Sequence, residues 1–103
     1  MRVRSNQNFG LIFERIAPME ITMSVEEYVE AQGLRLSWQP GSRIEARCLA
    51  GEVVIKANRA GLVSLANHLL TLAQENVPAG NHLHFDDSNA LEQGSCALIL
   101  ERT

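Results

Sequence analysis

The stretch "RIEARCLAGEVVIKANRAGLVSLANHLLTLA", Arg43–Ala73, decides the fold because its hydrophobic period changes once along its length. Residues 43–48 alternate apolar with charged side chains, and "LAG" then turns the chain into the apolar run "EVVIKA" at 52–57. From Asn58 onward the apolar residues recur every three or four positions, which is the period of a helix. This pattern predicts two antiparallel strands followed by one long helix.

The predicted helix begins at Asn58, a favourable N-cap residue, and ends near Pro78 and Gly80. One half of its helical wheel is apolar and is predicted to pack on the sheet: Leu62, Leu65, Ala66, Leu69, Leu72 and Ala73. The other half is polar and is predicted to point away from the sheet: Ser64, Asn67, His68, Thr71, Gln74 and Glu75. Gly61 lowers helix propensity, which suggests a close backbone approach.

Three further strands are predicted. "LRLSW" at 34–38 alternates and places Trp38 in the core, while "HLHFD" at 82–86 and "SCALILE" at 95–101 follow the helix. Ser24 and Glu27 form a capping-box pair that favours a short helix over 25–32, although "MEITMSV" from Met19 also fits a strand. We therefore expect an α+β fold: a mostly antiparallel sheet of about five strands with one main helix packed on one face.

The length suits a single domain over residues 1–103, with the patterned core at 33–102 and residues 1–18 as a candidate loose leader. One helix covers one face of such a sheet, so something else must shield parts of the second face. The N-terminal segment is one candidate, and a second copy of the chain, forming a homodimer, is the other.

Composition excludes several classes of protein. The net charge of −3 does not favour nucleic-acid binding, and no stretch approaches the roughly 20 apolar residues of a membrane span. The early apolar run, Leu11–Phe13, is too short for a signal peptide. Cys48 and Cys96 are predicted to be two buried thiols in a reducing cytosol; a disulfide is the alternative, which their spacing does not support.

His82, His84 and Asp86 raise the question of a metal site, because alternate residues of a strand project to one face. Leu83 and Phe85 should face the helix, so the two histidines point away from it, and His68 is not expected to join them. A polar strand face or interface is the favoured interpretation. A metal-binding protein or metalloenzyme that uses these three residues is the alternative.

Enzymatic motifs are missing from the sequence. There is no G-x-S-x-G elbow, no phosphate-binding glycine loop and no CxxC pair for zinc, and neither cysteine has an identifiable neighbouring base. We therefore predict no catalytic residues, no cofactor and no bound metal. Strand parity instead predicts a basic open face with Arg35, Arg43, Glu45, Arg47 and Lys56. The residues predicted to contact a partner are Arg35, Arg43, Arg47, His82, His84 and Asp86.

The order of elements over residues 33–102 resembles immunity family thirty-two of the bacterial polymorphic toxin systems. The resemblance rests on a "GL..LA..L..LA" helix at Gly61–Ala73, a "G.H.H.D" strand at Gly80–Asp86 and an "LE.GS..L.I" ending at Leu91–Ile99. It implies a non-catalytic cytoplasmic antidote whose partner is a cognate toxin protein. The arginines on the open face do not favour inhibition by mimicking a nucleic acid.

Overall fold

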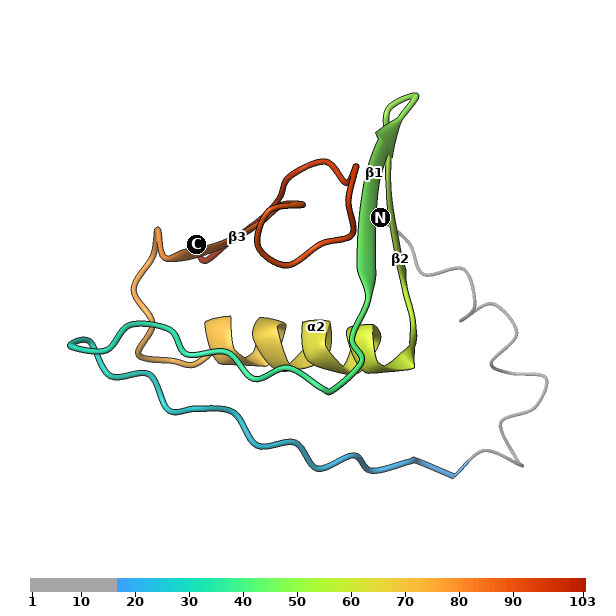
Figure 1. Cartoon of the computed structure of the whole chain (residues 1–103). Helices are drawn as coiled ribbons and strands as arrows, with labels where there is room; N and C mark the ends of the chain where they lie inside the picture. The colour runs from blue at the N-terminus through green and yellow to red at the C-terminus, as the bar shows by residue number, and fades with distance from the viewer. Residues whose placement is uncertain (1–16) are drawn as a thin grey trace.

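The computed structural model describes residues 17–103, an α+β arrangement whose described part has one helix and four strands. In chain order these are β1 (Ile44–Leu49), β2 (Glu52–Ala57), α2 (Arg59–Leu72), β3 (His82–Phe85) and β4 (Leu98–Glu101). Both strand pairs lie on the same side of α2 (Figure 1). No helix in residues 17–103 is long and apolar enough to cross a membrane.

The β1–β2 hairpin confirms the strand prediction for residues 43–57. Its antiparallel register runs from Ile44 opposite Ala57 to Leu49 opposite Glu52. Ala50 and Gly51 form the two-residue turn with φ of 51° and 80°. Positive φ at both positions is the geometry of a type I′ turn, whose twist matches that of the flanking strands.

The sheet differs from the expected one. β1 pairs with β2 and β3 pairs with β4, giving two separate two-stranded sheets, so about five strands in one sheet are not confirmed. The segment 92–96 connects them, because the amides of Glu92 and Cys96 donate to the carbonyls of Ile44 and Ala46 at 2.8 and 3.0 Å. The edge of β1 that faces away from β2 is thus hydrogen-bonded to an irregular segment that leads into β4.

The predicted strand at 34–38 is extended but has no strand partner within residues 17–103. Side chains of α2 take the place of a neighbouring strand. The Gln39 amide donates to Ser64 Oγ at 2.8 Å, and His68 Nε2 donates to the Ser37 carbonyl at 3.0 Å. The prediction that Trp38 is a core residue is wrong, because its side chain is 42% exposed. Its ring packs edge-on against His68, with the ring centroids 4.2 Å apart.

The predicted short helix over 25–32 is wrong. Residues 30–32 form a turn closed by a bridge between Val29 and Gly33, and Gly33 has a φ of 72°. Local backbone bonds occur only in this turn, where the Gln32 and Gly33 amides donate to the Val29 carbonyl, whereas the Tyr28 amide donates to Gln74 Oε1, just after α2, at 3.0 Å. Long-range partners have therefore replaced the local hydrogen bonds that a helix would need.

Helix α2 begins where the sequence predicts. Asn58 Oδ1 accepts from the Gly61 amide at 2.8 Å and from the Arg43 amide at 3.0 Å, so the N-cap also holds the start of β1. The helix ends at Leu72, earlier than expected, where the Ala73 amide is shared between the carbonyls of Leu69 and Leu70. The chain then turns to Val77, which is buried in the core.

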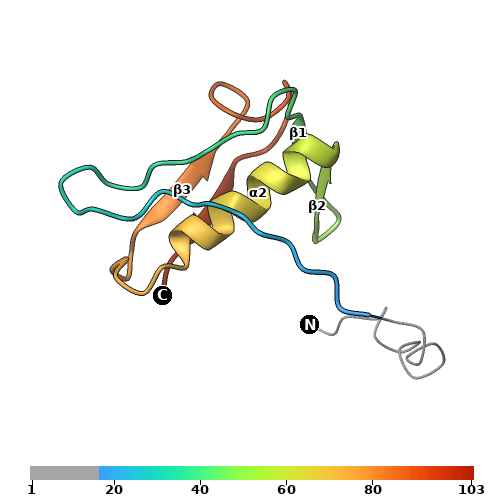
Figure 2. The ribbon, with the colours of Figure 1, turned by 90° about the horizontal axis from the view of Figure 1, so that it is seen from below.

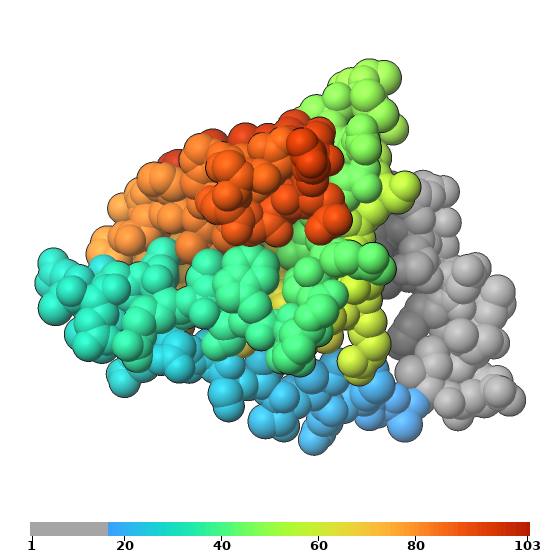
Figure 3. Space-filling view, in the orientation of Figure 1, coloured from blue at the N-terminus to red at the C-terminus, as the bar shows by residue number. Residues whose placement is uncertain are grey.

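A small core lies between α2 and the two strand pairs. Its buried apolar members are Ile44, Ala46, Leu72, Val77, Leu83, Phe85 and Leu91. Residues 17–28 cross α2 on the side opposite the strands (Figure 2). Residues 30–43 fill the space between that segment and the C-terminal strands on the face shown in Figure 3. The helix is therefore packed between the strands and the N-terminal segments.

Candidate protein-binding surface

The orientation of α2 corrects the sequence prediction about its faces. The predicted outward polar residues Ser64, Asn67, His68 and Thr71 are buried, and His68 has no exposed surface. The apolar residues Leu62, Leu69 and Leu70, of which Leu62 and Leu69 were predicted to pack on the sheet, are 55%, 50% and 51% exposed. The helix thus turns much of its apolar surface toward solvent.

Buried polar side chains of α2, and the half-buried Gln74 just after it, bond to the backbone of the N-terminal segments. Asn67 Nδ2 donates to the Ser24 carbonyl at 2.8 Å, and Gln74 Nε2 donates to the Glu26 carbonyl at 2.9 Å. Together with the bonds that Ser64 and His68 make, they satisfy backbone groups that pair with no strand of residues 17–103. An unpaired polar group is costly in a low-dielectric interior, so the inward polar face of α2 is stable because these backbone groups pair with its buried side chains.

The sequence carries a signal for this orientation, which its hydrophobic period does not reveal. From Ser64 to Gln74 the polar face carries hydroxyl, amide and imidazole groups and no Lys, Arg, Asp or Glu. Solvent-facing helix surfaces usually carry charged residues, whereas uncharged hydrogen-bonding groups can be buried once they have partners. The apolar residues also extend over more of the wheel than one sheet can cover.

The outward stripe of α2 is the first candidate surface for a partner. With about 100° between successive residues, its members occupy one continuous arc of the helix. They are the exposed residues Leu62, Leu69, Leu70 and Ala73 and the half-buried Val63 and Ala66. Contiguous exposed apolar surface on a soluble protein usually marks an interaction site.

A groove of about 710 Å³ adjoins one end of this stripe, between α2 and the N-terminal segment. Its apolar lining comes from both walls: Met19, Ile21 and Met23 on one side, and Leu62, Val63 and Ala66 on the other. Arg59 supplies a charge at its border. Leu62, Val63 and Ala66 belong to both features, so stripe and groove form one apolar surface.

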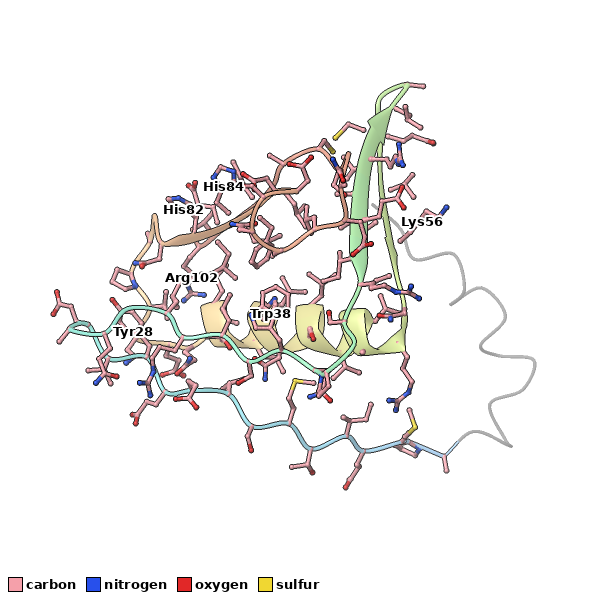
Figure 4. The ribbon with its side chains drawn as sticks, viewed as in Figure 1. Tyr28, Trp38, Lys56, His82, His84 and Arg102 are labelled. Carbon is pink, nitrogen blue, oxygen red and sulfur yellow. The ribbon has the colours of Figure 1, made fainter. Side chains whose placement is uncertain are left out.

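The structure does not gather the six predicted partner-binding residues on one face of a single sheet. Arg43 and Arg47 lie just before and within β1, whereas Arg35 lies in an irregular segment and pairs with Glu26 at 2.6 Å. His82, His84 and Asp86 lie within and just after β3, in the other strand pair. Figure 4 shows the two histidines far from Lys56 of the hairpin.

The candidate metal ligands are placed as strand parity predicts, with His82 and His84 exposed and Leu83 and Phe85 buried. His84 Nε2 lies 3.7 Å from Asp86 Oδ2, and His82 Nδ1 lies 3.2 Å from the Gly80 carbonyl. Within residues 17–103, no three His, Cys, Asp or Glu side chains are close enough to hold a metal ion. His68, packed in the core, is separate from them.

Two carboxylates on these faces are stabilised in their charged form. Two hydrogen bonds to Asp86 Oδ1 lower the pKa of Asp86. The bond from the Ser88 hydroxyl has the larger effect, and the bond from the Ser88 amide has the next largest. A hydrogen bond from the Arg47 guanidinium lowers the pKa of Glu45. Asp86 is thus used to stabilise the turn after β3, which leaves it a structural role whether or not it contacts a partner.

The cysteines are not the two buried thiols that the sequence predicts. Cys48 is exposed at the outer half of β1, Cys96 is half-buried, and both are free. Their sulfur atoms are 2.9 Å apart. The hydrogen bond with the Cys96 thiol raises the pKa of Cys48, so its nucleophilic thiolate form is disfavoured.

Comparison with known protein families gives a match over the C-terminal half of the chain. The family model described as immunity protein 32 matches residues 52–103. The matched part contains β2, α2, β3 and β4, and with them every residue of the outward stripe of α2. No curated protein and no solved structure matches the chain.

Proposed function

The chain belongs to the immunity protein 32 family, and we propose that it is a cytoplasmic antidote that binds and neutralises the toxin domain of a bacterial polymorphic toxin. The family match over residues 52–103 is the observation that carries this proposal. In this function the chain needs no chemistry of its own. Neutralisation follows from covering the active site of the toxin, or from holding the toxin in an inactive form.

We place the centre of the toxin interface on the outward stripe of α2. Leu62, Leu69 and Leu70 are the exposed apolar side chains there, and specific protein interfaces have an apolar centre surrounded by polar residues. The adjoining groove beside Met19 and Ile21 would accept an apolar side chain of the toxin. A stable complex of this kind buries roughly 1,200–2,000 Å² in total.

The charged residues on the other surfaces are candidates for choosing among toxins. Arg35, Arg43 and Arg47 are exposed, as are His82 and His84, with Asp86 beside them. Exposed charges contribute more to specificity and association rate than to affinity. We therefore expect single alanine substitutions of these six residues to alter the association rate more than the dissociation rate.

The test begins with the toxin. The gene directly upstream should encode a large secreted protein, and its C-terminal domain is the binding probe. We expect co-expression of the full chain to restore growth to cells that produce this domain, and the two purified proteins to form a stable complex with equal numbers of both chains. A metabolic operon without a toxin gene, or a toxin domain that neither binds nor is inhibited, would contradict the proposal.

The position of the interface has a separate test. Leu69→Glu places a charge in the outward stripe and should weaken the complex by about 100-fold, the scale of an interface hot spot. Leu49→Glu, at another strongly exposed leucine beside the β1–β2 turn, is the matched control and should leave the Kd unchanged. Circular dichroism checks that both variants fold. Equal affinities for both variants would move the interface away from α2 without affecting the antidote function.

A further inference from the structure

Strand β2 has an open edge in the described part of the chain. Within residues 17–103 it pairs only with β1, in a register without interruption from Glu52 to Ala57. Val53, Val54 and Ile55 are 64%, 40% and 40% exposed. Proteins usually protect such an edge with proline, a bulge or several charges, and this six-residue strand has no proline, no bulge and only Glu52 and Lys56 as charges. The edge is therefore available to another strand.

The direction of the peptide groups follows from the hairpin register. The Asn58 amide donates to the Arg43 carbonyl at 3.1 Å, so positions 43 and 58 form a hydrogen-bonded pair. Bonded and non-bonded pairs alternate along an antiparallel ladder, which makes Val54 opposite Arg47 a bonded pair as well. The amide and carbonyl groups of Val53 and Ile55 therefore point away from β1, toward the open edge.

We propose that two copies of the chain pair through these edges, antiparallel, about a two-fold axis at Val54. In this register Val53 of each copy lies opposite Ile55 of the other. Their outward amides and carbonyls then bond to one another, and the two hairpins become one four-stranded sheet. A two-fold interface of this kind is self-complementary, since each copy presents the same strand.

Charge complementarity selects this register. Glu52 of each copy lies opposite Lys56 of the other, at the non-bonded positions where facing side chains come closest. Lys56 then stands between two carboxylates, because Glu45 is its partner on β1. A shift of two residues in either direction removes both intermolecular ion pairs. A shift of one residue would place apolar side chains opposite charged ones.

The apolar residues support the same register. Ala46, Cys48, Val53 and Ile55 share one face of the hairpin, and Ala46 is the member of this set that is buried in the core. In the four-stranded sheet these residues of both copies form a continuous apolar band. Side chains that are exposed on one copy would then be neighbours of apolar groups on the other.

Charge reversal tests the register on the full chain by sedimentation equilibrium. The unchanged protein should be a dimer of the 11.4 kDa chain. Glu52→Lys and Lys56→Glu, each alone, place like charges opposite one another twice and should weaken dimerisation by about tenfold or more. The two single variants mixed together should form a heterodimer. The double variant E52K/K56E should regain the homodimer, because both of its intermolecular pairs are opposite in charge again.

The double variant also keeps this result separate from folding effects. It retains the unfavourable contact with Glu45 that Lys56→Glu introduces, so only an intermolecular pair explains recovery. Val53→Pro provides a second test, since it removes an outward amide and no bond to β1. It should abolish the dimer while the circular dichroism spectrum stays unchanged.

Several results would overturn the proposal. The unchanged protein could be monomeric up to about 1 mM, or its dimer could be insensitive to charge reversal and to Val53→Pro. A monomer whose binding to the toxin domain is lost in Val53→Pro would assign the edge to a toxin strand instead.

Discussion

His68 shows at the scale of one residue how a polar side chain can be a core residue. Nε2 donates to the Ser37 carbonyl, so the neutral ring carries its proton there. Within the described part of the chain Nδ1 has no hydrogen-bond partner. The ring also contacts Trp38 and Phe85, with centroids 4.2 and 5.4 Å away. A second proton would put an uncompensated charge in the core.

Acidification should therefore destabilise the protein through His68. Burial lowers the pKa of His68, and the hydrogen bond to the Ser37 carbonyl raises it by a smaller amount. The unfolded chain binds the proton more readily, so the stability is present above the unfolded pKa of about 6.5 and is lost as the pH falls below it. We expect the Tm to fall between pH 7.5 and 5.5, more steeply than in His68→Gln, whose amide can still donate to Ser37.

The comparison should stay above pH 5.5. The lowered pKa values of Glu45 and Asp86 mean that these carboxylates lose their stabilising effect only at more acidic pH, as the pH falls through and below about 4. Equal slopes of Tm against pH in the unchanged protein and in His68→Gln would show that His68 does not cause the loss of stability between pH 7.5 and 5.5.

At the scale of elements, one contact decides how α2 meets the hairpin. A Cβ added at Gly61 would lie 2.5 Å from the Arg43 carbonyl oxygen, 2.9 Å from Ile44 Cγ1 and 3.1 Å from Ala57 Cβ. Two of these atoms are backbone oxygen and a short side chain that cannot move aside. The close approach predicted from Gly61 is thus confirmed. The N-cap Asn58 reinforces it, because its Oδ1 accepts hydrogen bonds from the amides of both Gly61 and Arg43.

Gly61→Ala should therefore destabilise the protein. In an exposed helix this change stabilises by about 1 kcal/mol, but overpacking here should outweigh it and give a net loss of about 1–3 kcal/mol. Urea unfolding measures the difference. Arg59→Ala, on the exposed side of the same first turn, is the control and should change stability by less than about 0.5 kcal/mol. A variant as stable as the unchanged protein would contradict the packing.

At the scale of the whole molecule, the segment 92–96 ties the two strand pairs together. It bonds to Ile44 and Ala46 of β1 and leads into β4, and the thiols of Cys48 and Cys96 meet beside these bonds. The sequence spacing alone did not support a disulfide between them. Residues 48 positions apart in the chain are nevertheless neighbours in space.

Mild oxidation with diamide should join Cys48 and Cys96 within one chain. The loop it closes is long, so chain-entropy arguments give a stabilisation of about 4 kcal/mol. Mass spectrometry of the intact chain should show the loss of two hydrogen atoms. A digest without reductant should contain the Cys48 and Cys96 peptides joined by a disulfide, and the Tm should rise. Cys48→Ser and Cys96→Ser are the controls and should show neither change. Disulfides formed only between chains would contradict the packing of 92–96 on β1.

The local patterns alone determined the α+β class, the β1–β2 hairpin, the start of α2 and the positions of strands β3 and β4 in the sequence. In each case neighbours in the sequence supply the physical cause: alternation, a two-residue turn, or an N-cap. The ordered pattern also pointed to the immunity family that the match over residues 52–103 confirms. The six partner-binding residues stay predictions.

The tertiary structure alone decided which face of α2 is buried and what residues 19–42 become. The apolar half of the helix resembles a core face, and "LRLSW" resembles a strand. Extended segments at 24–28 and 37–39 need hydrogen-bond partners, however, and they find them on Ser64, Asn67, His68 and Gln74. Partners 25–48 positions away outweigh a local hydrophobic period, because a buried polar side chain without a partner costs more than a leucine left partly in water.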